Sequence, residues 1–298
     1  MTSENKSPTA GTILPAPSAR GALLLDRNLA RRVEHAEAQA AAECVETVER
    51  LRPGGKAALL RVGGGYAVYC GADSPITQAV ALGLDGPVSE EEFDRMEDFY
   101  RIRGEAVRVE TCPLADASLL EQYGRRGYRV TEFSNVLARA VADSEPAAAG
   151  EELPAGLTIA RTGPSRIDLW TLTVAQGFAE HYPVTEDLLE VMRMFALGSH
   201  VECYLARIEG KVAGGGALMI RDGVAGLFGA STLPAFRHRG VQTGLLRARL
   251  ERAAEKGCDL AVSLAQVGSA SQRNIVRHGF QVLYSRAKFE KHGGRHDD

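Results

Sequence analysis

The 298-residue sequence predicts an α+β protein built from two similar halves in tandem. The chain is long enough for two ordinary domains. Both halves show the same order of elements, namely a helical region, three short strands, a helix, a strand, a helix and a last strand. The stretches RRGYRV at 125–130 and RHGFQV at 277–282 hold the same rank in that order. We therefore predict a duplication, with a mixed, mostly antiparallel sheet flanked by helices in each half.

Composition and charge narrow the class of protein. Hydrophobic residues make up 45% and charged residues 24% of the chain, which is typical of a soluble globular protein. The net charge of −3 argues against a partner that is nucleic acid or an anionic membrane. No stretch approaches the eighteen or so apolar residues of a membrane span. The sequence therefore predicts a cytoplasmic protein.

The cysteines predict reduced thiols. They are scattered singly, with no C-x-x-C pair, at Cys44, Cys70, Cys112, Cys203 and Cys258. An odd, dispersed set fits neither a disulfide framework nor a zinc site. We expect no metal. Cys203 and Cys258 lie at or in predicted strands and are expected in the core.

The first half begins with a long helix rich in Ala, Glu and Arg, over 29–51. A hairpin follows around the GGG at 63–65. The segment at 89–104 has a Ser cap, acidic residues in its first turn and apolar residues at helical spacing, so it predicts a helix. The other predicted elements are a strand at 77–84, a strand at 106–112, a helix at 114–127 and a strand at 128–140.

The second half repeats this order. Helical stretches over 165–198 precede three strands, and the later elements alternate helix and strand. The lone Trp170 lies on an apolar helical stripe and is expected in the core. The predicted elements are helical stretches at 165–198, strands at 201–210, 211–223 and 224–233, a helix at 240–257, a strand at 259–266, a helix at 269–279 and a strand at 280–291.

An Ala-, Pro-, Gly- and Glu-rich stretch without an apolar period nearly bisects the chain and is the best linker candidate. The first residues lack the basic end and apolar run of a secretory signal, and their Ser, Thr, Pro and Gly content predicts a disordered tail. The predicted division is a tail at 1–20, one domain at 21–139, a linker at 140–156, a second domain at 157–291 and a tail at 292–298.

The stretch RHRGVQTG at 237–244 carries the strongest chemical signal. It follows an apolar strand and opens a helix. Glycine at such a turn lets the backbone approach a ligand, and the free N–H groups and dipole of the helix start favour a diphosphate. A turn with solvated Arg237 and Arg239 is the competing interpretation of these residues taken alone. The dinucleotide and Walker A glycine patterns are both absent.

Together with the element order and the SQRNIVRHGF ending, this loop resembles the GNAT superfamily of acyl-CoA-dependent N-acyltransferases over about residues 157–291. The family carries [Q/R]-x-x-G-x-[G/A] at this point. Arg237 and Gly240 match that pattern, whereas Gln242 stands where a small residue is expected. The resemblance implies acetyl-CoA as co-substrate.

The resemblance also implies which residues meet coenzyme A. The loop would hold the pyrophosphate, and the end of the preceding strand would bind pantetheine and polarise the thioester carbonyl. Ser271 and Asn274, on the following helix, are further candidates. The resulting cofactor-binding residues are Ser231, Thr232, Leu233, Arg237, His238, Arg239, Gly240, Val241, Gln242, Thr243, Gly244, Ser271 and Asn274.

At two positions this chain lacks the residue type that the family often carries. Where the family often has an Asn, eleven residues before the glycine of the GF pair, this chain has Gly268. Where it often uses a tyrosine as general acid, four residues before that glycine, this chain has Ile275. Neither role transfers.

The first half resembles a degenerate copy of the same unit. At the point that corresponds to the loop it reads LGLDGPVSEEEF, with Asp85, Glu90, Glu91 and Glu92 in place of cations. Four carboxylates at a helix start repel a diphosphate. We expect this half to bind no coenzyme A and to act as a structural partner or as a wall of the substrate site.

The catalytic groups are less well defined. An alkyl amine is mostly protonated at pH 7, so acyl transfer needs a base. Glu180, His181 and Tyr182 form a compact polar group between two helices, of which Glu180 and His181 are the candidates, with a plain interhelical loop as the alternative. Tyr204 is the next candidate and shares a strand face with Glu202, with sheet packing as the alternative. Tyr284 is a candidate proton donor.

Three arginines of the helix after the loop, Arg247, Arg249 and Arg252, are expected on its solvated side. His292 and His296 are expected in a frayed tail and not at a metal site.

The sequence as a whole predicts an N-acetyltransferase that transfers an acetyl group from acetyl-CoA to the amine of a small molecule or peptide, with transfer of an amino-acyl group excluded. A coenzyme A-binding sensor without turnover and an assembly protein are the alternatives. The acceptor, the acyl chain length and the presence of a homodimer are left open.

Overall fold

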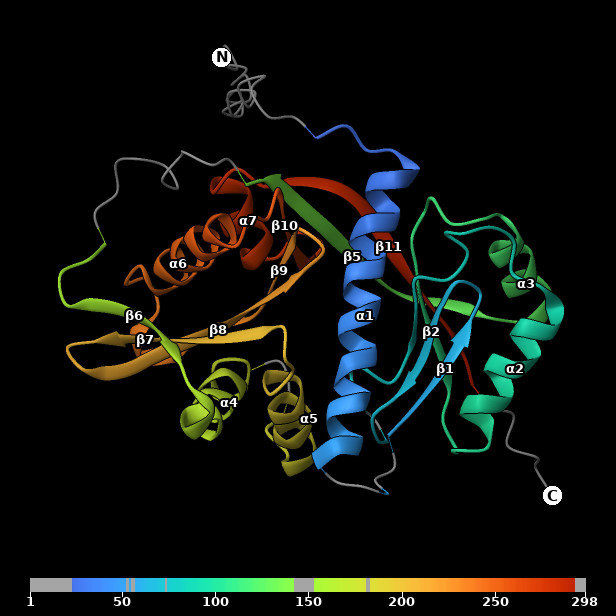
Figure 1. Cartoon of the computed structure of the whole chain (residues 1–298), viewed down its shortest axis with the longest axis horizontal. Coiled ribbons are helices and arrows are strands. Elements are labelled where there is room, and N and C mark those ends of the chain that lie inside the picture. The colour runs from blue at the N-terminus through green and yellow to red at the C-terminus, as the bar shows by residue number, and fades with distance from the viewer. Residues whose placement is uncertain are drawn as a thin grey trace, which may run out of the picture.

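The structure, a computed structural model, describes residues 23–51, 54, 57–72, 74–141, 153–180 and 183–292 (Figure 1). The predicted N-terminal tail lies outside these residues, as do most of the predicted linker and of the C-terminal tail. No helix among the described residues is long and apolar enough to cross a bilayer.

The first half begins with one 25-residue helix, where the second half has two shorter helices. The predicted third strand is reduced to two residues, because Ala81 takes a positive φ of 59° and turns the chain. The elements of this half are α1 (Arg27–Leu51), β1 (Ala58–Val62), β2 (Gly65–Tyr69), β3 (Ala79–Val80), α2 (Glu90–Arg101), β4 (Val107–Thr111), α3 (Ser118–Arg126) and β5 (Arg129–Ala140).

The second half repeats the order, with one strand that the sequence analysis missed. This strand, β6, pairs antiparallel with β7 at the edge of the sheet. The elements of this half are β6 (Leu157–Thr162), α4 (Ile167–Gly177), α5 (Glu186–Ala196), β7 (Val201–Ile208), β8 (Lys211–Arg221), β9 (Val224–Thr232), α6 (Val241–Glu255), β10 (Leu260–Gln266), α7 (Ala270–Arg277) and β11 (Gln281–Lys291).

The eleven strands of the described residues form one sheet in the order β1-β2-β3-β4-β11-β5-β10-β9-β8-β7-β6. The last strand of each half is exchanged: β5 pairs with β10 of the second half, and β11 pairs with β4 of the first half. The two exchanged strands also pair with each other along most of their length. The predicted α+β class, with a mixed and mostly antiparallel sheet flanked by helices, is confirmed. The exchange of β5 and β11 joins the strands of the two halves into one continuous sheet.

The second half has helices on both faces of its sheet (Figure 1). Alternate residues of β7 point to opposite faces. Cys203 and Leu205 pack with Trp170 of α4, whereas Tyr204 and Ala206 pack with α6. Helix α7 packs on the α6 face, and α1 and α5 lie on the α4 face.

A buried ion cluster fastens the exchanged β11 to the first half. Arg286 of β11 donates to Glu34 Oε1 at 2.8 Å and Glu37 Oε2 at 2.6 Å on α1, and to Glu110 Oε2 at 3.1 Å on β4. Tyr284 of β11 donates to the same Glu34 oxygen at 2.7 Å. Only 2% of the side chains of Arg286 and Glu34 is exposed. The two halves are therefore interlocked by hydrogen-bonded strands and by buried charge.

The cysteines are unpaired thiols, and Cys44, Cys112, Cys203 and Cys258 are buried. Burial raises the pKa of Cys112 to about 11 and that of Cys203 to about 12. Because the thiolate is the reactive form, we expect Ellman's reagent at pH 8 to modify the half-buried Cys70 roughly tenfold faster than the others. Cys70→Ser should remove that fast phase. Two or more fast thiols in the folded protein would contradict the burial seen here.

Candidate active site

The strands β9 and β10 separate part-way along their length. They pair in parallel from Val224 and Leu260 as far as Leu227 and Ser263. Beyond that point β10 continues to pair with β5 and β9 with β8, but not with each other. The main-chain groups of β9 from Phe228 onward therefore face an opening, which we call the splay. Unpaired backbone groups of this kind are available to a ligand.

A bulge lies in β9 at the splay. Ser231 pairs with Gly215 and Phe228 with Ala217, so two residues, Gly229 and Ala230, oppose the single Gly216. Gly229 has a φ of +58°, which favours glycine. A bulge of this type turns backbone groups out of the ladder and aims them elsewhere.

Two buried side chains brace the bulge. The indole of Trp170 donates to the carbonyl of Gly216 at 3.0 Å. The guanidinium of Arg249 donates to the carbonyl of Ala217 at 3.0 Å and to that of Phe228 at 3.3 Å. Trp170 was predicted in the core, and it is buried there.

The expectation that Arg249 lies on the solvated side of α6 is wrong. Its residue exposure is 3%, and desolvation lowers its pKa to about 10, so it stays charged at neutral pH. Arg249 falls on the same helical stripe as Val241, Leu245 and Ala253, all of which are buried. That spacing of four was visible in the sequence and could have identified it. Arg252 is also not free, because it pairs with Glu202 at 2.9 Å.

The predicted phosphate loop follows β9 after a short 3-10 turn at Pro234–Phe236. His238 and Gly240 have positive φ values of 60° and 74°. Gly240 is the N-cap of α6 and no side chain caps the helix. The first-turn N–H groups of a helix have no intrahelical partner, and with the helix dipole they form a site for an anion. A side chain at Gly240 would meet the ring of Pro154 at 2.8 Å.

The side chains of the loop are placed as follows. Arg237 forms an ion pair with Glu180 at 2.8 Å, and both side chains are partly exposed. Such an exposed pair contributes about 0–1 kcal/mol, so an anionic ligand can displace it. Gln242 donates from Nε2 to Thr232 Oγ1 at 2.9 Å, which ties the helix start to the end of β9. Arg239 lies over the ring of Phe236.

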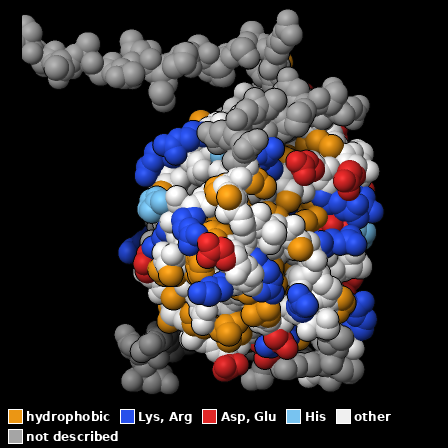
Figure 2. Space-filling view, turned by 90° about the vertical axis from the view of Figure 1, so that its left-hand side faces the viewer, with side chains coloured by type: hydrophobic (Ala, Val, Ile, Leu, Met, Phe, Trp, Pro, Cys, Tyr) orange, Lys and Arg blue, Asp and Glu red, His pale blue; other side chains and the backbone are white. Residues whose placement is uncertain are grey.

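The remaining loop residues differ in exposure. His238 and Arg239 are exposed, Leu233 and Thr243 are half-buried, and Val241 and Gly244 are buried. Lys and Arg side chains occupy much of the face that carries β6, with fewer Asp and Glu side chains beside them (Figure 2). An anionic cofactor is attracted to such a face.

Ser231 adds a polar group to this region. It is 3% exposed, and its hydroxyl oxygen is buried with no hydrogen-bond partner among the described residues. It contacts α4 closely, because a Cβ on Gly177 would lie 2.3 Å from the Ser231 hydroxyl. A buried hydroxyl without a partner loses the free energy of a hydrogen bond unless a ligand or water supplies one.

The two candidates on α7 lie beyond the splay. Ser271 is exposed and Asn274 is half-buried. The helix is capped by Ser269, whose hydroxyl accepts from the N–H of Gln272. Ile275, which stands at the tyrosine position of the family, is a core residue.

Glu180 and Tyr204, the two predicted catalytic residues that the structure describes, have different partners. Glu180 lies beside the phosphate loop through its pair with Arg237. Tyr204 points to the α6 face and donates to Glu202 Oε2 at 3.0 Å, which confirms that the two share a face. His181 and Tyr182 lie outside the described residues. Tyr284, predicted as a proton donor, belongs to the buried ion cluster.

Glu202 gives a pH-dependent contribution to stability. Desolvation raises its pKa, but hydrogen bonds from Arg252 and Tyr204 outweigh this and lower the net pKa below the ordinary value. A carboxyl with a lowered pKa stabilises the fold above that ordinary value, and the contribution is lost as the pH falls. We expect Glu202→Gln to be less stable than wild type at pH 7 and the difference to shrink towards pH 3, as measured by urea unfolding. An undiminished difference at pH 3 would contradict this.

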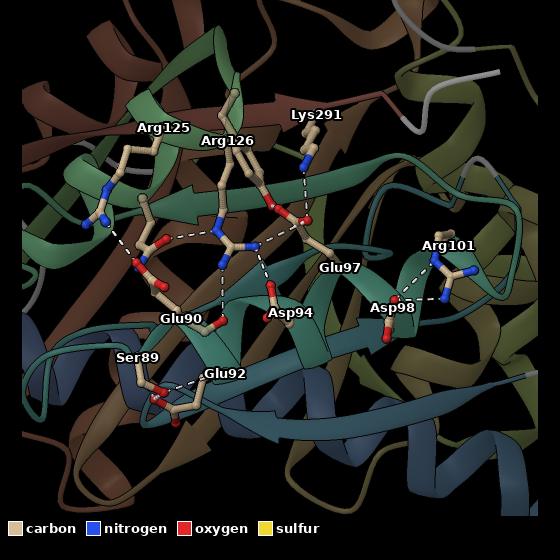
Figure 3. Close-up of polar contacts among 12 residues, drawn as sticks. Ser89, Glu90, Glu92, Asp94, Glu97, Asp98, Arg101, Arg125, Arg126 and Lys291 are labelled. Carbon is tan, nitrogen blue, oxygen red and sulfur yellow. Dashed lines mark hydrogen bonds and ion pairs between the residues drawn. The ribbon is translucent and has the colours of Figure 1, made fainter. Parts of the chain in front are cut away.

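The corresponding point of the first half is closed by its own side chains (Figure 3). Ser89 caps α2, and Glu92 reaches back to the N–H of Ser89, which completes a capping box. Glu92 also accepts from the N–H of Gly63 at 2.9 Å. Arg125 pairs with Glu90 at 2.8 Å. The N-terminus of α6 has no side-chain cap among the described residues. That of α2 is capped by Ser89 and lies among carboxylates.

A cavity of about 390 Å³ lies between the halves, and we call it the inter-half cavity. Helix α1 and the segment 75–80 form its wall from the first half. Helices α4 and α5 and strands β8, β9 and β10 form the other walls. It includes Leu227 and Ser263, the last paired residues before the splay. No pattern in the sequence indicates this cavity, because its walls come from segments that are far apart along the chain.

Among the described residues, no group of three or more His, Cys, Asp or Glu side chains is placed to hold a metal ion.

Residues 168–280 match the model of the Acetyltransferase (GNAT) family. Over these residues the predicted resemblance to the GNAT superfamily is confirmed. The match begins in α4 and ends after α7, so it includes the splay, the phosphate loop and the bulge. No curated protein matches the sequence.

Solved GNAT structures share the fold over nearly their whole length. A GCN5-related N-acetyltransferase from Kribbella flavida has a TM-score of 0.61 at 18% identity, covering 86% of this chain and 96% of that chain. A tandem GNAT protein from the clavulanic acid biosynthesis pathway has a TM-score of 0.59 at 15% identity, covering 91% and 96%. A GCN5-related N-acetyltransferase from Sphaerobacter thermophilus has a TM-score of 0.55 at 17% identity, covering 88% and 93%. At these identities the likeness shows the fold, and the fold agrees with the family match over residues 168–280.

Proposed function

We propose that this protein is an N-acetyltransferase that transfers the acetyl group of acetyl-CoA to an amine. The observation that carries the proposal is the uncapped N-terminus of α6, which lies at the end of β9 next to the splay. One short segment thus offers a site for a diphosphate and, beside it, free main-chain groups for the pantetheine arm.

In this proposal the N–H groups at the start of α6 bind the pyrophosphate, and Arg237 leaves Glu180 to pair with it. The main chain of Phe228–Leu233 binds pantetheine, and the Ser231 hydroxyl gains a partner there. Ser271 and Asn274 contact a more distant part of coenzyme A. The residues proposed for the cofactor are otherwise those of the loop, Arg237 to Gly244, with Thr232.

The chemistry is nucleophilic acyl transfer. The amine nitrogen attacks the thioester carbonyl carbon, the C–S bond breaks, and the thiolate of coenzyme A takes up a proton. The negative charge that develops on the carbonyl oxygen is stabilised by N–H groups aimed at it, for which the bulge at Gly229–Ala230 is the candidate. Arg249 holds this bulge through the carbonyl of Phe228 and adds a buried positive charge behind it.

The base that takes the amine proton stays a prediction. Glu180 lies beside the phosphate loop through its ion pair with Arg237, whereas Tyr204 lies on β7 and packs with α6, so these two candidates have different surroundings. The division into a coenzyme A-binding domain at 157–291 and a first domain at 21–139 is likewise proposed, with β5 and β11 shared between them.

Isothermal titration with acetyl-CoA tests the proposal, followed by thiol-release assays on a panel of amines. We expect binding with one site per chain and release of coenzyme A with at least one class of amine. Failure of the folded protein to bind acetyl-CoA would exclude the proposal. Binding without thiol release on any amine would favour a coenzyme A sensor, in which the Gln242–Thr232 contact restricts the site.

A further inference from the structure

The inter-half cavity borders the proposed pantetheine site at Phe228 and Gly229, and its other lining residues have no role in the binding of coenzyme A described above. We propose that it binds the acceptor, and that the acceptor is a primary amine with a compact apolar body, such as an aryl or branched alkyl group. This inference rests on the proposed function and adds the substrate class.

The first argument is position. Helix α6 packs on the face of β8 to which Gly214 and Gly216 point, and α4 packs on the face of Gly215. The pyrophosphate site belongs to the α6 side, whereas the inter-half cavity is bounded by α1, α4 and α5 on the other side. A cofactor that enters the splay from α6 therefore presents its thioester to the cavity. A nucleophile held there approaches from the opposite face without displacing the cofactor.

The second argument is the chemistry of the walls. Aliphatic and aromatic side chains form nearly all of the lining, and Phe195 and Phe228 meet edge to face at 4.6 Å. Two polar groups of the wall are already in use, since Ser263 donates to the carbonyl of Leu227 and Trp170 to that of Gly216; the other polar side chains of the lining are Gln78 and Glu37. A sugar or amino-acid acceptor would leave several polar groups without partners here, at a cost of about 1–3 kcal/mol each.

The third argument is charge. Glu37 is the only charged side chain among the described residues that line the inter-half cavity. Its Oε2 accepts from Arg286 at 2.6 Å, and its Oε1 has no hydrogen-bond partner among the described residues. A carboxylate in an apolar wall attracts an ammonium group, which explains why the ligand of an otherwise apolar cavity would be a cation.

The volume sets the size of the apolar body. An apolar cavity of about 150 Å³ is large enough to bind benzene. The inter-half cavity, at about 390 Å³, therefore accommodates a body of about two rings. Three alanines of α1, Ala36, Ala40 and Ala41, line it and leave this room. The first half, which has a closed α2 N-terminus, thereby acquires a role as a wall of the acceptor site.

The test compares amines of increasing apolar size at saturating acetyl-CoA, with kcat/KM measured by thiol release. Each added methylene that is buried should raise kcat/KM about fourfold, up to the size of 2-phenylethylamine. Glucosamine and glycinamide should be at least about a hundredfold poorer than 2-phenylethylamine. Equal rates for propylamine and 2-phenylethylamine, in a protein that binds acetyl-CoA, would overturn this inference and leave the proposed function intact.

Two tryptophan variants on α5 form a matched pair. Val191 lines the inter-half cavity, whereas Leu189, on the same helix and also half-buried, does not. Val191→Trp should lower kcat/KM for 2-phenylethylamine by about tenfold or more and change that for propylamine little. Leu189→Trp should change neither. Equal loss in both variants, with acetyl-CoA binding intact, would contradict the assignment. Glu37→Gln should raise KM for every amine, and an unchanged KM would remove Glu37 from the site.

An acyl-CoA series distinguishes the other use of an apolar cavity. If the cavity held the acyl chain, octanoyl-CoA would exceed acetyl-CoA as donor to propylamine, and Val191→Trp would abolish that preference. This result would overturn the acceptor assignment. We expect acetyl-CoA to remain the better donor. Absence of binding by every acyl-CoA would instead remove the proposed function and, with it, this inference.

Discussion

Gly240→Val should abolish measurable acetyl-CoA binding, with a loss of at least about a hundredfold in affinity. Gly240 has a φ of +74°, which a β-branched residue adopts only with strain, and its added Cβ would lie 2.8 Å from Pro154. Both effects turn the first N–H groups of α6 away from their present direction. Each hydrogen bond to a charged ligand contributes about 1.5–3 kcal/mol, so the loss of two accounts for this magnitude.

The opposite end of the same helix supplies the control. Gly257 follows α6 with a φ of +70°, and no atom lies within 4 Å of a Cβ built there. Gly257→Val therefore introduces similar backbone strain and a similar loss of stability, about 1–3 kcal/mol, without touching the loop. It should bind acetyl-CoA as wild type does in isothermal titration at a temperature where both variants are folded. Full binding by Gly240→Val would show that the pyrophosphate does not lie at the start of α6.

The sequence predicted the elements well and their partners poorly. The segment at 128–140 was expected as a strand, and it is one, but its neighbours are β10 and β11 and not a strand of its own half. Periodicity reports which side of a strand is buried, and it carries no information about which strand lies beside it. Val136, Leu137 and Ala138 are buried on both faces, so any central position in a sheet would suit them.

The candidate site likewise has one part that the sequence predicts and another that it does not. The loop is local, since its glycine positions and the helix start lie within eight residues, and the sequence placed it between a strand and a helix, as the structure does. The splay, the bulge and the inter-half cavity depend on where pairing stops between distant strands. Arg249 was misjudged because an arginine on a helix is usually exposed, although its spacing from Val241 and Leu245 put it on the buried stripe.

Arg286→Leu should destabilise the fold by about 3–5 kcal/mol. Arg286 is buried and forms ion pairs with three carboxylates, those of Glu34, Glu37 and Glu110. Desolvation lowers its pKa, but these carboxylates raise it well above the ordinary value, so the cation is firmly held. Removal of one partner of a buried ion pair leaves the other buried charge uncompensated, which explains the size of the loss.

The loss of stability in Arg286→Leu should depend on pH. Burial already raises the pKa of Glu34, against the attraction of Arg286. Without Arg286 that pKa rises further, and the folded state then binds a proton that the unfolded state has released. Stability falls with rising pH wherever the folded state holds more protons. The deficit of Arg286→Leu should therefore be larger at pH 8 than at pH 5, as measured by urea unfolding at both values. A deficit independent of pH would mean that Glu34 is not left with a buried charge.

The double variant Glu34→Leu with Arg286→Leu separates the charge from the packing. Replacement of a buried pair by apolar residues of similar volume is often close to neutral, so the double variant should recover much of the loss at pH 8. Because β11 pairs with β4 of the first half and also follows α7 of the second, all of these proteins should unfold in a single transition. Two separate transitions in wild type would show that the exchanged strands and the ion cluster do not couple the halves.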